Sequence, residues 1–503
     1  MLELKDISIR LKCDDRSIIE NFSFTLMPGD KAVIIGEEGN GKSTLLKFVY
    51  DPSLISGYCE YSGKVITNAH LAYLPQMMPE ELYDVMLAEY FGETEYYYHF
   101  DTINMLGLDV DFLLSEQKLG TLSGGEKVKV QLCRMMMDDP DVLLLDEPTN
   151  DLDIETLTWL EDFISDSKLP VLYISHDETL IEKTANVILH MEQLIRKTKC
   201  RMTVTRASYR DYLASRRSTF DHQEQVAHKQ RADYAKQMER WRRIYERVNH
   251  EQSSISRSDP SGGRLLKKKM HSVQSMGKRF EREKENFVEF PQEEEAIITK
   301  FDESISLPNG KIVLDLSLDT LSNGTSVLSE NIELTVTGGE IVGITGRNGA
   351  GKSTLLKYIW ELLSRRTDII ASYMPQNYAD VLEYDKTPIE HLASRFAKED
   401  ITRARTFMGS MRFTHEEMTG KIGALSGGQR AKILFLDMVL KGANVLVLDE
   451  PTRNFSPLSS PVVRHALADF GGTIISISHD RKYLTEVCDT VYELDSTGLH
   501  KMY

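Results

Sequence analysis

The chain has 503 residues, of which 41% are hydrophobic, which suits a globular protein of two or three domains. Its net charge of −17 would by itself argue against contact with nucleic acid. No apolar run reaches the roughly eighteen residues of a membrane-spanning helix, so an integral membrane protein is not expected. The five cysteines are scattered and odd in number, which argues against a metal site or a disulfide framework and favours a reducing cytoplasm.

The first predicted functional element is a short buried strand at 32–35 that leads into a glycine-rich loop and a helix. The loop fits the pattern G-x-x-x-x-G-K-[ST], whose glycines turn backbone N–H groups toward a phosphate chain. The helix N-terminus adds a positive dipole. We expect Lys42 to bridge the β- and γ-phosphates of a nucleotide and Ser43 to ligate Mg²⁺. The residues assigned to this cradle are Gly36, Gly39, Gly41, Lys42, Ser43 and Thr44.

Polar residues follow three further predicted strands or motifs in the first half. The apolar stretch 142–145 ends in Asp146 and Glu147, which we expect to hold Mg²⁺ and to act as general base toward the attacking water, respectively. Gln76 follows Leu-Pro and is a candidate contact to Mg²⁺ and water. His176 follows the predicted strand 171–174 and is a candidate contact to the γ-phosphate.

A Leu-Ser-Gly-Gly segment lies between these motifs, at the predicted start of a helix. Its Gly124 and Gly125 would free backbone donors, and Ser123 would add a hydroxyl. The segment is a weak signal when taken alone.

The middle of the chain is predicted to form a helical hairpin. Residues 207–252 lack Pro and Gly, and a second helix is expected after a turn at 253–263. Apolar residues follow a 4-3-4-3 spacing on the first helix and a compatible seam on the second, which indicates an antiparallel coiled coil. These seams are Tyr234, Met238, Trp241, Tyr245 and Val248, and then Leu266, Met270, Val273, Phe280 and Phe287.

The outer part of this hairpin is basic although the whole chain is acidic. Residues 229–279 contain fourteen Lys or Arg and five Asp or Glu. Charge runs on helices are often solvated faces, but on a projecting arm they favour contact with the phosphate backbone of nucleic acid. The residues assigned to this contact are Arg240, Arg242, Arg243, Arg247, Arg257, Arg264, Lys267, Lys268 and Lys269.

The motifs of the first half recur in the second half, three of them with the same shift of 303 residues. We assign Ser353, Gln376 and Asp449 to Mg²⁺ and Glu450 and His479 to catalysis. The remaining equivalents are Gly346, Gly349, Gly351, Lys352, Thr354, Ser426, Gly427 and Gly428. Apolar strands that alternate with helices predict an α/β fold with parallel sheets. The expected domains are 1–200, a hairpin linker at 201–290, and 291–503.

This constellation resembles the ATP-binding cassette superfamily in both halves. The resemblance implies two P-loop cassettes that pair head to tail within one monomer, with ATP and Mg²⁺ as cofactors. One ATP would lie between Lys42 and Ser426, and the other between Lys352 and Ser123. Binding would close the pair and hydrolysis would open it.

Two cassettes without membrane spans, joined by a charged helical hairpin, resemble the ABC-F proteins. That resemblance implies ATP-dependent binding to the ribosome, with the hairpin in the exit-tRNA site near large-subunit rRNA, the peptidyl-tRNA and the peptidyl-transferase centre. The segment that begins Asp449-Glu450-Pro451-Thr452 and continues to Ser456 resembles the antibiotic-resistance branch. Its members protect ribosomes from lincosamides, pleuromutilins and streptogramin A.

The two predicted nucleotide sites differ in charge. Ser456 stands where the first half has Asp153, and it would face the cradle that contains Glu37 and Glu38. We hypothesise that this site hydrolyses slowly or mainly holds the cassettes together. The alternative is that Glu37 and Glu38 point to solvent.

Three other functions stay open at this point. A housekeeping ABC-F translation factor that relieves stalled ribosomes would have the same motifs. The ATPase subunit of a membrane transporter is disfavoured by the basic hairpin. A DNA-repair or chromosome ATPase would need zinc cysteines or a longer coiled coil. The sequence leaves open the drug spectrum, the tRNA and the residues that stack on adenine.

Overall fold

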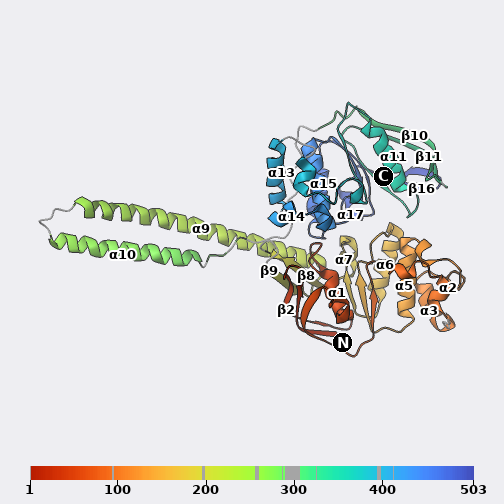
Figure 1. The fold of residues 1–503 in the computed structure, drawn as a ribbon, viewed down its shortest axis with the longest axis horizontal. Helices are drawn as coiled ribbons and strands as arrows, with labels where there is room; N and C mark the ends of the chain where they lie inside the picture. The colour runs from red at the N-terminus through yellow and green to blue at the C-terminus, as the bar shows by residue number, and fades with distance from the viewer. Residues whose placement is uncertain are drawn as a thin grey trace. The chain divides into compact units, whose positions relative to one another are not determined.

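The computed structural model describes residues 2–92, 96–194, 199–254, 260–285, 287–288, 290, 306–324, 326–393, 398–411 and 413–503. The chain forms two units, one made of Met1–Tyr209 and Glu294–Tyr503 and the other of Arg210–Glu293. Among these described residues, no helix is both long and apolar enough to cross a bilayer. The first unit contains the two cassettes, and the second contains the two long helices of Figure 1.

The first cassette is built on a six-stranded sheet with the order β5-β6-β7-β3-β8-β9. Five strands are parallel, and β9 pairs antiparallel with β8. The strands are β3 (Lys31–Ile35), β5 (Leu71–Leu74), β6 (Val142–Asp146), β7 (Val171–Ile174), β8 (Val187–Gln193) and β9 (Lys199–Thr205). Every residue of β3, β6 and β7 is buried, as expected for strands covered on both faces.

Helices and a second sheet cover this core. The antiparallel sheet β2-β1-β4 is formed by β1 (Leu2–Leu11), β2 (Ser17–Leu26) and β4 (Cys59–Thr67). The α-helices are α1 (Lys42–Tyr50), α2 (Leu87–Phe91), α3 (Phe100–Met105), α4 (Val110–Leu113), α5 (Gly124–Met136), α6 (Ile154–Asp166) and α7 (Glu178–Thr184). The short 3₁₀ helices are η1 (Pro52–Ile55), η2 (Glu80–Leu82), η3 (Tyr96–His99) and η4 (Leu119–Thr121).

The second cassette repeats this architecture with the sheet order β13-β14-β15-β12-β16-β17. Its strands are β10 (Ile312–Ser322) and β11 (Val327–Thr337), which form a separate antiparallel pair, and β12 (Ile341–Thr345), β13 (Ala371–Met374), β14 (Val445–Asp449), β15 (Thr473–Ile477), β16 (Thr490–Asp495) and β17 (Gly498–Lys501). Its helices are α11 (Lys352–Ser364), η6 (Tyr378–Asp380), α12 (Pro388–Ala393), α13 (Lys398–Ser410), α14 (His415–Thr419), η7 (Ile422–Ala424), α15 (Gly427–Lys441), α16 (Ser460–Ala468) and α17 (Arg481–Glu486). The matching strand orders confirm the predicted α/β fold.

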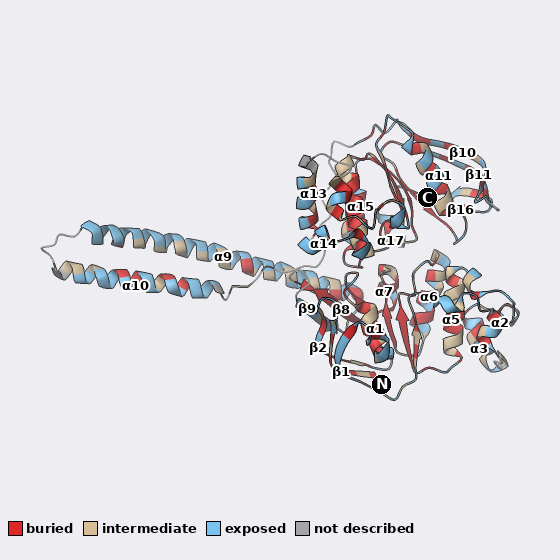
Figure 2. Cartoon of the chain, viewed as in Figure 1, coloured by how far each residue is buried: buried red, intermediate tan, exposed pale blue. Residues whose placement is uncertain are grey.

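The second unit consists of α9 (Tyr209–Ser254) and α10 (Pro260–Glu285), which pack antiparallel. Trp241 is central to the packing, because its ring Nε1 donates to the Val273 carbonyl at 2.7 Å. A Cβ at Gly277 would lie 2.9 Å from the same ring, so only glycine lets the helices approach this closely. Most of the other residues of α9 and α10 are exposed (Figure 2).

The turn between these helices differs from the prediction of 253–263. Ser253 and Ser254 end α9, and Pro260 to Gly263 begin α10, so these residues are helical. Proline is well tolerated in the first helical turn, because the N–H it lacks would have no partner there. The rest of the predicted tip, residues 255–259 with Arg257, lies outside the described residues.

Candidate functional site

The two glycine-rich loops have the same closed geometry. Gly41 and Gly351 precede α1 and α11 with φ of 93° and 96°, in the left-handed region that favours glycine. Lys42 Nζ donates to the Gly36 carbonyl at 2.8 Å, and Lys352 Nζ donates to the Gly346 carbonyl at 2.7 Å. Both ammonium groups therefore lie inside a ring of backbone, where a phosphate chain could replace the carbonyl partners.

The predicted Mg²⁺ ligands come together at the end of the central strands. Ser43 Oγ donates to Asp146 Oδ1 at 2.8 Å, and Ser353 makes the same hydrogen bond to Asp449. Burial raises the pKa of Asp146 and Asp449 above the ordinary value, since each carboxylate has lost its hydration. A hydroxyl and a desolvated carboxylate form a donor set that fits Mg²⁺, which prefers hard oxygen ligands.

Glu147 is held from three directions. Gln76 Nε2 and Asn150 Nδ2 donate to its Oε2 at 3.0 and 2.9 Å, and His176 Nε2 lies 3.3 Å from its Oε1. Burial by itself would raise the pKa of Glu147, but His176, Lys42 and Asn150 outweigh it and hold the pKa well below its ordinary value. Two predicted site residues, Gln76 and His176, thus meet around an ionised carboxylate.

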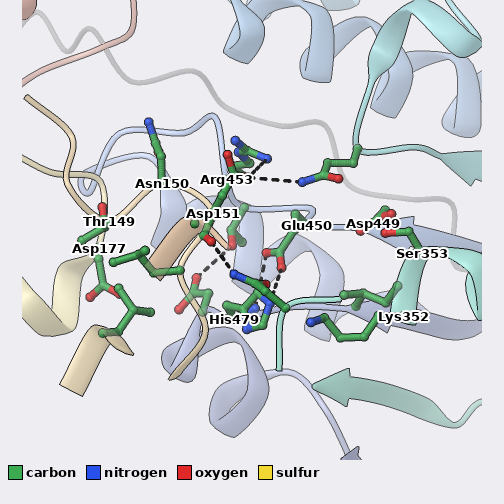
Figure 3. A pocket seen from close by; sticks show the side chains of 18 of the residues that line it. Thr149, Asn150, Asp151, Asp177, Lys352, Ser353, Asp449, Glu450, Arg453 and His479 are labelled. Atoms are coloured by element: carbon green, nitrogen blue, oxygen red, sulfur yellow. Dashed lines mark hydrogen bonds and ion pairs between the residues drawn. The ribbon is translucent and has the colours of Figure 1, made fainter. Parts of the chain in front are cut away.

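Glu450 has a different environment in the second cassette (Figure 3). Its Oε2 accepts a long hydrogen bond from the His479 backbone N–H at 3.4 Å. Glu450 Oε1 and His479 Nδ1 are buried, and among the described residues neither has a hydrogen-bond partner. Burial and the adjacent charge of Asp449 raise the pKa of Glu450 to about 8, and burial and the charge of Lys352 lower the pKa of His479 to about 4. Buried polar atoms without partners fit a site that a phosphate and a water molecule complete.

Both carboxylates have strained backbones. Glu147 and Glu450 have φ of 49° and 53°, in the left-handed region that side chains other than glycine seldom adopt. Each backbone N–H donates across to the neighbouring strand, to Ile174 O at 3.1 Å and to Ile477 O at 3.0 Å. The same strain at the same place in both cassettes marks these positions as functional.

The Leu-Ser-Gly-Gly segments begin α5 and α15. Ser123 and Ser426 cap these helices, and each hydroxyl accepts a backbone N–H at 3.3 Å. A Cβ at Gly124 would lie 2.4 Å from the Asp151 carbonyl, and one at Gly428 would lie 2.6 Å from the Asn454 carbonyl. The glycines therefore leave room for the segment that follows Asp-Glu-Pro-Thr in the same cassette, a reason that the sequence did not suggest.

Two cavities lie between the cassettes, and each takes residues from both. The cavity at Lys352 and Ser353 has a volume of about 520 Å³, and the first cassette contributes Gly124 and Asp151 to its wall. The cavity at Lys42 has a volume of about 430 Å³ and is closed by Asn454 of the second cassette. We call the cavity at Lys42 the first composite site and the cavity at Lys352 the second composite site. Gln376 lines the second site and lies 3.4 Å from Asp151 Oδ1.

Glu37 and Glu38 do not point to solvent, so that alternative was wrong. The Glu37 carboxylate accepts hydrogen bonds from Ser456 Oγ at 2.7 Å and from Ser459 Oγ. Glu38 Oε2 accepts the Gly428 N–H at 2.5 Å, at the start of α15. Burial would raise the pKa of Glu37, but Lys432 and the two serine hydroxyls lower it below its ordinary value. Both acids of the first loop are therefore bound by the second cassette.

Some residues at these sites escaped the sequence analysis. Asn150 holds Glu147, Tyr73 donates to Asp146 Oδ2 at 3.1 Å, and Arg453 pairs with Asp151 at 3.0 Å across the cassettes. Arg16 lines the first composite site close to Gly39. Only Asn150 and Arg453 had a sequence signal, because both directly follow Asp-Glu-Pro-Thr.

The basic residues predicted for nucleic-acid contact lie on the hairpin unit. All of them within the described residues are exposed, on α9 from Arg240 to Arg247 and on α10 from Arg264 to Lys269. Arg242 and Arg243 form ion pairs along their own helix with Glu246 and Glu239. Arg257 lies outside the described residues.

Comparison with known proteins agrees with this fold. The family model described as ABC transporter matches residues 19–150 and 329–453, one stretch in each cassette. The chain therefore belongs to the ATP-binding cassette family and carries two of its ATPase cassettes in tandem. It binds and hydrolyses ATP.

The chain is similar to several curated proteins along most of their length. It is 27% identical to the putative ATP-binding protein YdiF of Bacillus subtilis, over 100% of this chain and 81% of YdiF. It is 26% identical to the energy-dependent translational throttle protein EttA of Haemophilus influenzae, over 97% of this chain and 91% of EttA. It is also 26% identical to the ribosome protection protein VmlR of Bacillus subtilis, over 100% of this chain and 88% of VmlR.

Similarity to a solved structure supports the fold alone. The archaeal ribosome recycling factor aABCE1 superposes with a TM-score of 0.60, covering 99% of this chain and 90% of that chain. The sequence identity is 16%, so the likeness concerns the arrangement of the two cassettes.

Proposed function

We propose that the protein is a ribosome-bound ABC-F ATPase of the protective kind. Its hairpin would enter the exit-tRNA site and shield the peptidyl-transferase centre from lincosamides, pleuromutilins and streptogramin A. The observation that carries this proposal is an exposed basic surface on a two-helix unit of an acidic, tandem-cassette ATPase. Such a surface suits the phosphate backbone of large-subunit rRNA and the peptidyl-tRNA. The site of action would be the cytoplasm.

In the proposed catalytic step, the loop lysines Lys42 and Lys352 exchange their carbonyl partners for the β- and γ-phosphates. Ser43 and Asp146, with Gln76, and Ser353 and Asp449, with Gln376, would hold Mg²⁺, which neutralises phosphate charge when bound. Glu147 and Glu450 would accept a proton from the attacking water.

The remaining site residues would bind and orient the nucleotide. His176 and His479 would position the γ-phosphate and the water. The N-termini of α5 and α15 at Ser123 and Ser426 would close each site from the opposite cassette.

The relatives support a ribosomal partner. VmlR is named a ribosome protection protein, and the match covers nearly its whole length. Such similarity makes ribosome binding the first function to test.

The test is co-sedimentation of the Glu147→Gln, Glu450→Gln double variant with ribosomes in ATP at physiological salt. This variant should close on ATP, hydrolyse it very slowly and stay in the ribosomal pellet. A version that also carries Lys267→Glu, Lys268→Glu and Lys269→Glu should remain in the supernatant.

The matched control reverses three exposed lysines of the cassettes, Lys5, Lys64 and Lys421. We expect this control to pellet like the parent. Absence of the ATP-locked parent from the ribosomal pellet would overturn the proposal.

A second candidate is a housekeeping translation factor, which the similarity to the translational throttle protein EttA favours. Expression in a susceptible bacterium separates the two roles. Raised resistance to lincosamides or pleuromutilins is expected for protection, and unchanged resistance together with ribosome binding would favour the housekeeping role. Within the protective role, Arg257→Ala, in the tip predicted from the sequence, should alter resistance while ATP turnover stays unchanged.

A further inference from the structure

Four charged residues occupy two equivalent positions of the duplicated cassettes. Glu161 in α6 corresponds to Arg464 in α16, and Glu178 in α7 corresponds to Arg481 in α17. Both correspondences have the shift of 303 residues that relates the motifs. The first cassette thus carries acids where the second carries arginines.

These four residues pair across the cassettes. Arg464 Nη1 lies 2.6 Å from Glu178 Oε1, and its Nη2 lies 3.3 Å from Glu178 Oε2, which makes a two-point contact. Arg481 pairs with Glu161 through a single contact, from its Nη2 to Glu161 Oε1. Lys482 adds a contact to Glu178 Oε2 at 3.1 Å.

Because the side chains in these contacts are buried, the contacts strongly affect which cassette surfaces can associate. The side chains of Glu161, Glu178 and Arg464 are exposed by only 2%, 6% and 5%. A buried charge that loses its partner costs far more free energy than an exposed one. An association that brought Glu178 against a second acid would therefore be strongly disfavoured.

The cassettes meet by an approximate twofold arrangement, since the α6 position of each pairs with the α17 or α7 position of the other. If two first cassettes met in this way, Glu161 would face Glu178. If two second cassettes met, Arg464 would face Arg481. Only the unlike pair gives opposite charges at both contacts.

The phosphate loops follow the same rule. Glu37 of the first loop binds the hydroxyls of Ser456 and Ser459, whereas Arg347 of the second loop pairs with Glu155 at 2.9 Å. The residue equivalent to Ser456 in the first cassette is Asp153, so a like pairing would set Glu37 against an acid. The unusual residues of the first loop are thus matched to their partners.

We propose that these residues form a charge code that admits pairing of the first cassette with the second and rejects pairing of like cassettes. The code concerns the surface where the cassettes join, with the unlike cassette as its partner. It keeps several copies of the chain from joining through like cassettes. It does not depend on the ribosomal function.

The test uses two full-length charge variants. Variant A is Glu161→Arg, Glu178→Arg, and variant B is Arg464→Glu, Arg481→Glu. In each variant alone, both cassettes carry the same charge, so we expect ATP turnover to fall by at least about tenfold. The combined fourfold variant restores opposite charges at both contacts between the cassettes. Lys183 and Glu486, which lie 2.6 Å from Glu161 and 2.7 Å from Arg464 in their own cassettes, would then face like charges, so we expect part of the turnover to return.

Mixing A with B gives a second, independent readout. The arginines of A can then pair with the acids of B, so light scattering should show a dimer in the mixture and monomers in each separate sample, with partial recovery of turnover. The control reverses the exposed ion pair between Asp84 and Lys118, which lies 2.8 Å apart with side chains 91% and 48% exposed, and should change nothing.

Two results would overturn the code. The first is wild-type turnover in both A and B. The second is a loss in A and B that neither the fourfold variant nor the mixture reverses, because the charges would then serve the folding of each cassette instead of its choice of partner. If the fourfold variant fails to fold, the mixture decides between these outcomes.

Discussion

Glu147 in the first composite site accepts two hydrogen bonds and lies 3.3 Å from His176 Nε2. In the second site, Glu450 Oε1 lies 3.9 Å from His479 Nε2 and has no hydrogen-bond partner among the described residues. The pKa of the first is lowered and that of the second is raised to about 8. The motifs at the two sites are almost the same, so the difference comes from residues around them. It teaches that a duplicated motif does not guarantee a duplicated electrostatic environment.

The two phosphate loops also differ in charge, since the first carries two acids and the second carries an arginine. The first loop presents Glu37 and Glu38 to hydroxyls and a helix N-terminus. The second presents Arg347 and Asn348 to Glu155 and to the Asp151 carbonyl. The departure at Ser456 is therefore one half of a matched contact with Glu37.

The largest expected effect concerns the two general-base candidates. If the first composite site mainly holds the cassettes together, Glu450→Gln should lower ATP turnover by at least about a hundredfold, while Glu147→Gln keeps a substantial fraction. Steady-state phosphate release from the two variants measures the difference. Equal losses of turnover in the two variants would contradict the hypothesis that the sites hydrolyse ATP at different rates. The two sites would then differ in their electrostatic environment but not in their rate.

A second prediction exchanges the chemistry of the loops. Ser456→Asp places a carboxylate against Glu37, and because like charges repel at a partly buried contact, the concentration of ATP at half-maximal turnover should rise by about tenfold. Adding Glu37→Arg creates the kind of pair found in the second site and should recover most of this loss. Failure of the double variant to recover, with a normal thermal midpoint, would show that Ser456 has another role.

A third prediction uses the raised pKa of Glu450 in the nucleotide-free protein. Glu450 ionises near its ordinary pKa of 4.5 in the unfolded chain and near 8 in the folded chain. Its contribution to the free energy of unfolding is therefore fully present below pH 4.5 and is lost progressively as the pH rises to about 8. Glu450→Gln removes this loss. Its thermal midpoint relative to the parent should therefore rise between about pH 5 and about pH 8.5, by roughly 2–4 °C for each kcal/mol.

Glu147→Gln is the matched control for that measurement. The lowered pKa of Glu147 means that its ionised form is stabilised in the fold, so the variant should lose stability at neutral pH. A gain in both variants, or in neither, would contradict the opposite environments.

Much of the fold and of each site was predictable from the sequence. Continuous apolar runs such as 142–145 gave buried parallel strands, and the motif order brought Ser43, Asp146 and Glu147 to one end of the sheet. Strand order was not predictable in detail, since it depends on which sheet edges pair. The hairpin turn was misplaced because Pro260 and two glycines normally signal turns, yet here they open a helix.

The unpredictable part of the sites lies in contacts between distant residues. The resemblance to the superfamily had placed Ser456 opposite the loop of Glu37, but no local pattern relates Glu161 to Arg481, because that contact exists only after the cassettes have paired. The left-handed backbone of Glu147 and Glu450 is likewise fixed by tertiary structure, since glutamate has no preference for that region.

The smallest expected effect tests how far charge at the loops depends on burial. Arg347 and Glu155 form an ion pair of 2.9 Å, but their side chains are 77% and 72% exposed, so solvent screens the pair. Arg347→Ala should change turnover and ATP affinity by less than about twofold. Glu37→Ala, by contrast, leaves Ser456 and Ser459 without their acceptor in a half-buried contact and should have a clearly larger effect. If Arg347→Ala lowered turnover as much as Glu37→Ala, exposed charges would have to contribute to cassette pairing as strongly as buried charges. Burial would then no longer be a reason to expect that the pairs at Glu161 and Glu178 select the partner cassette.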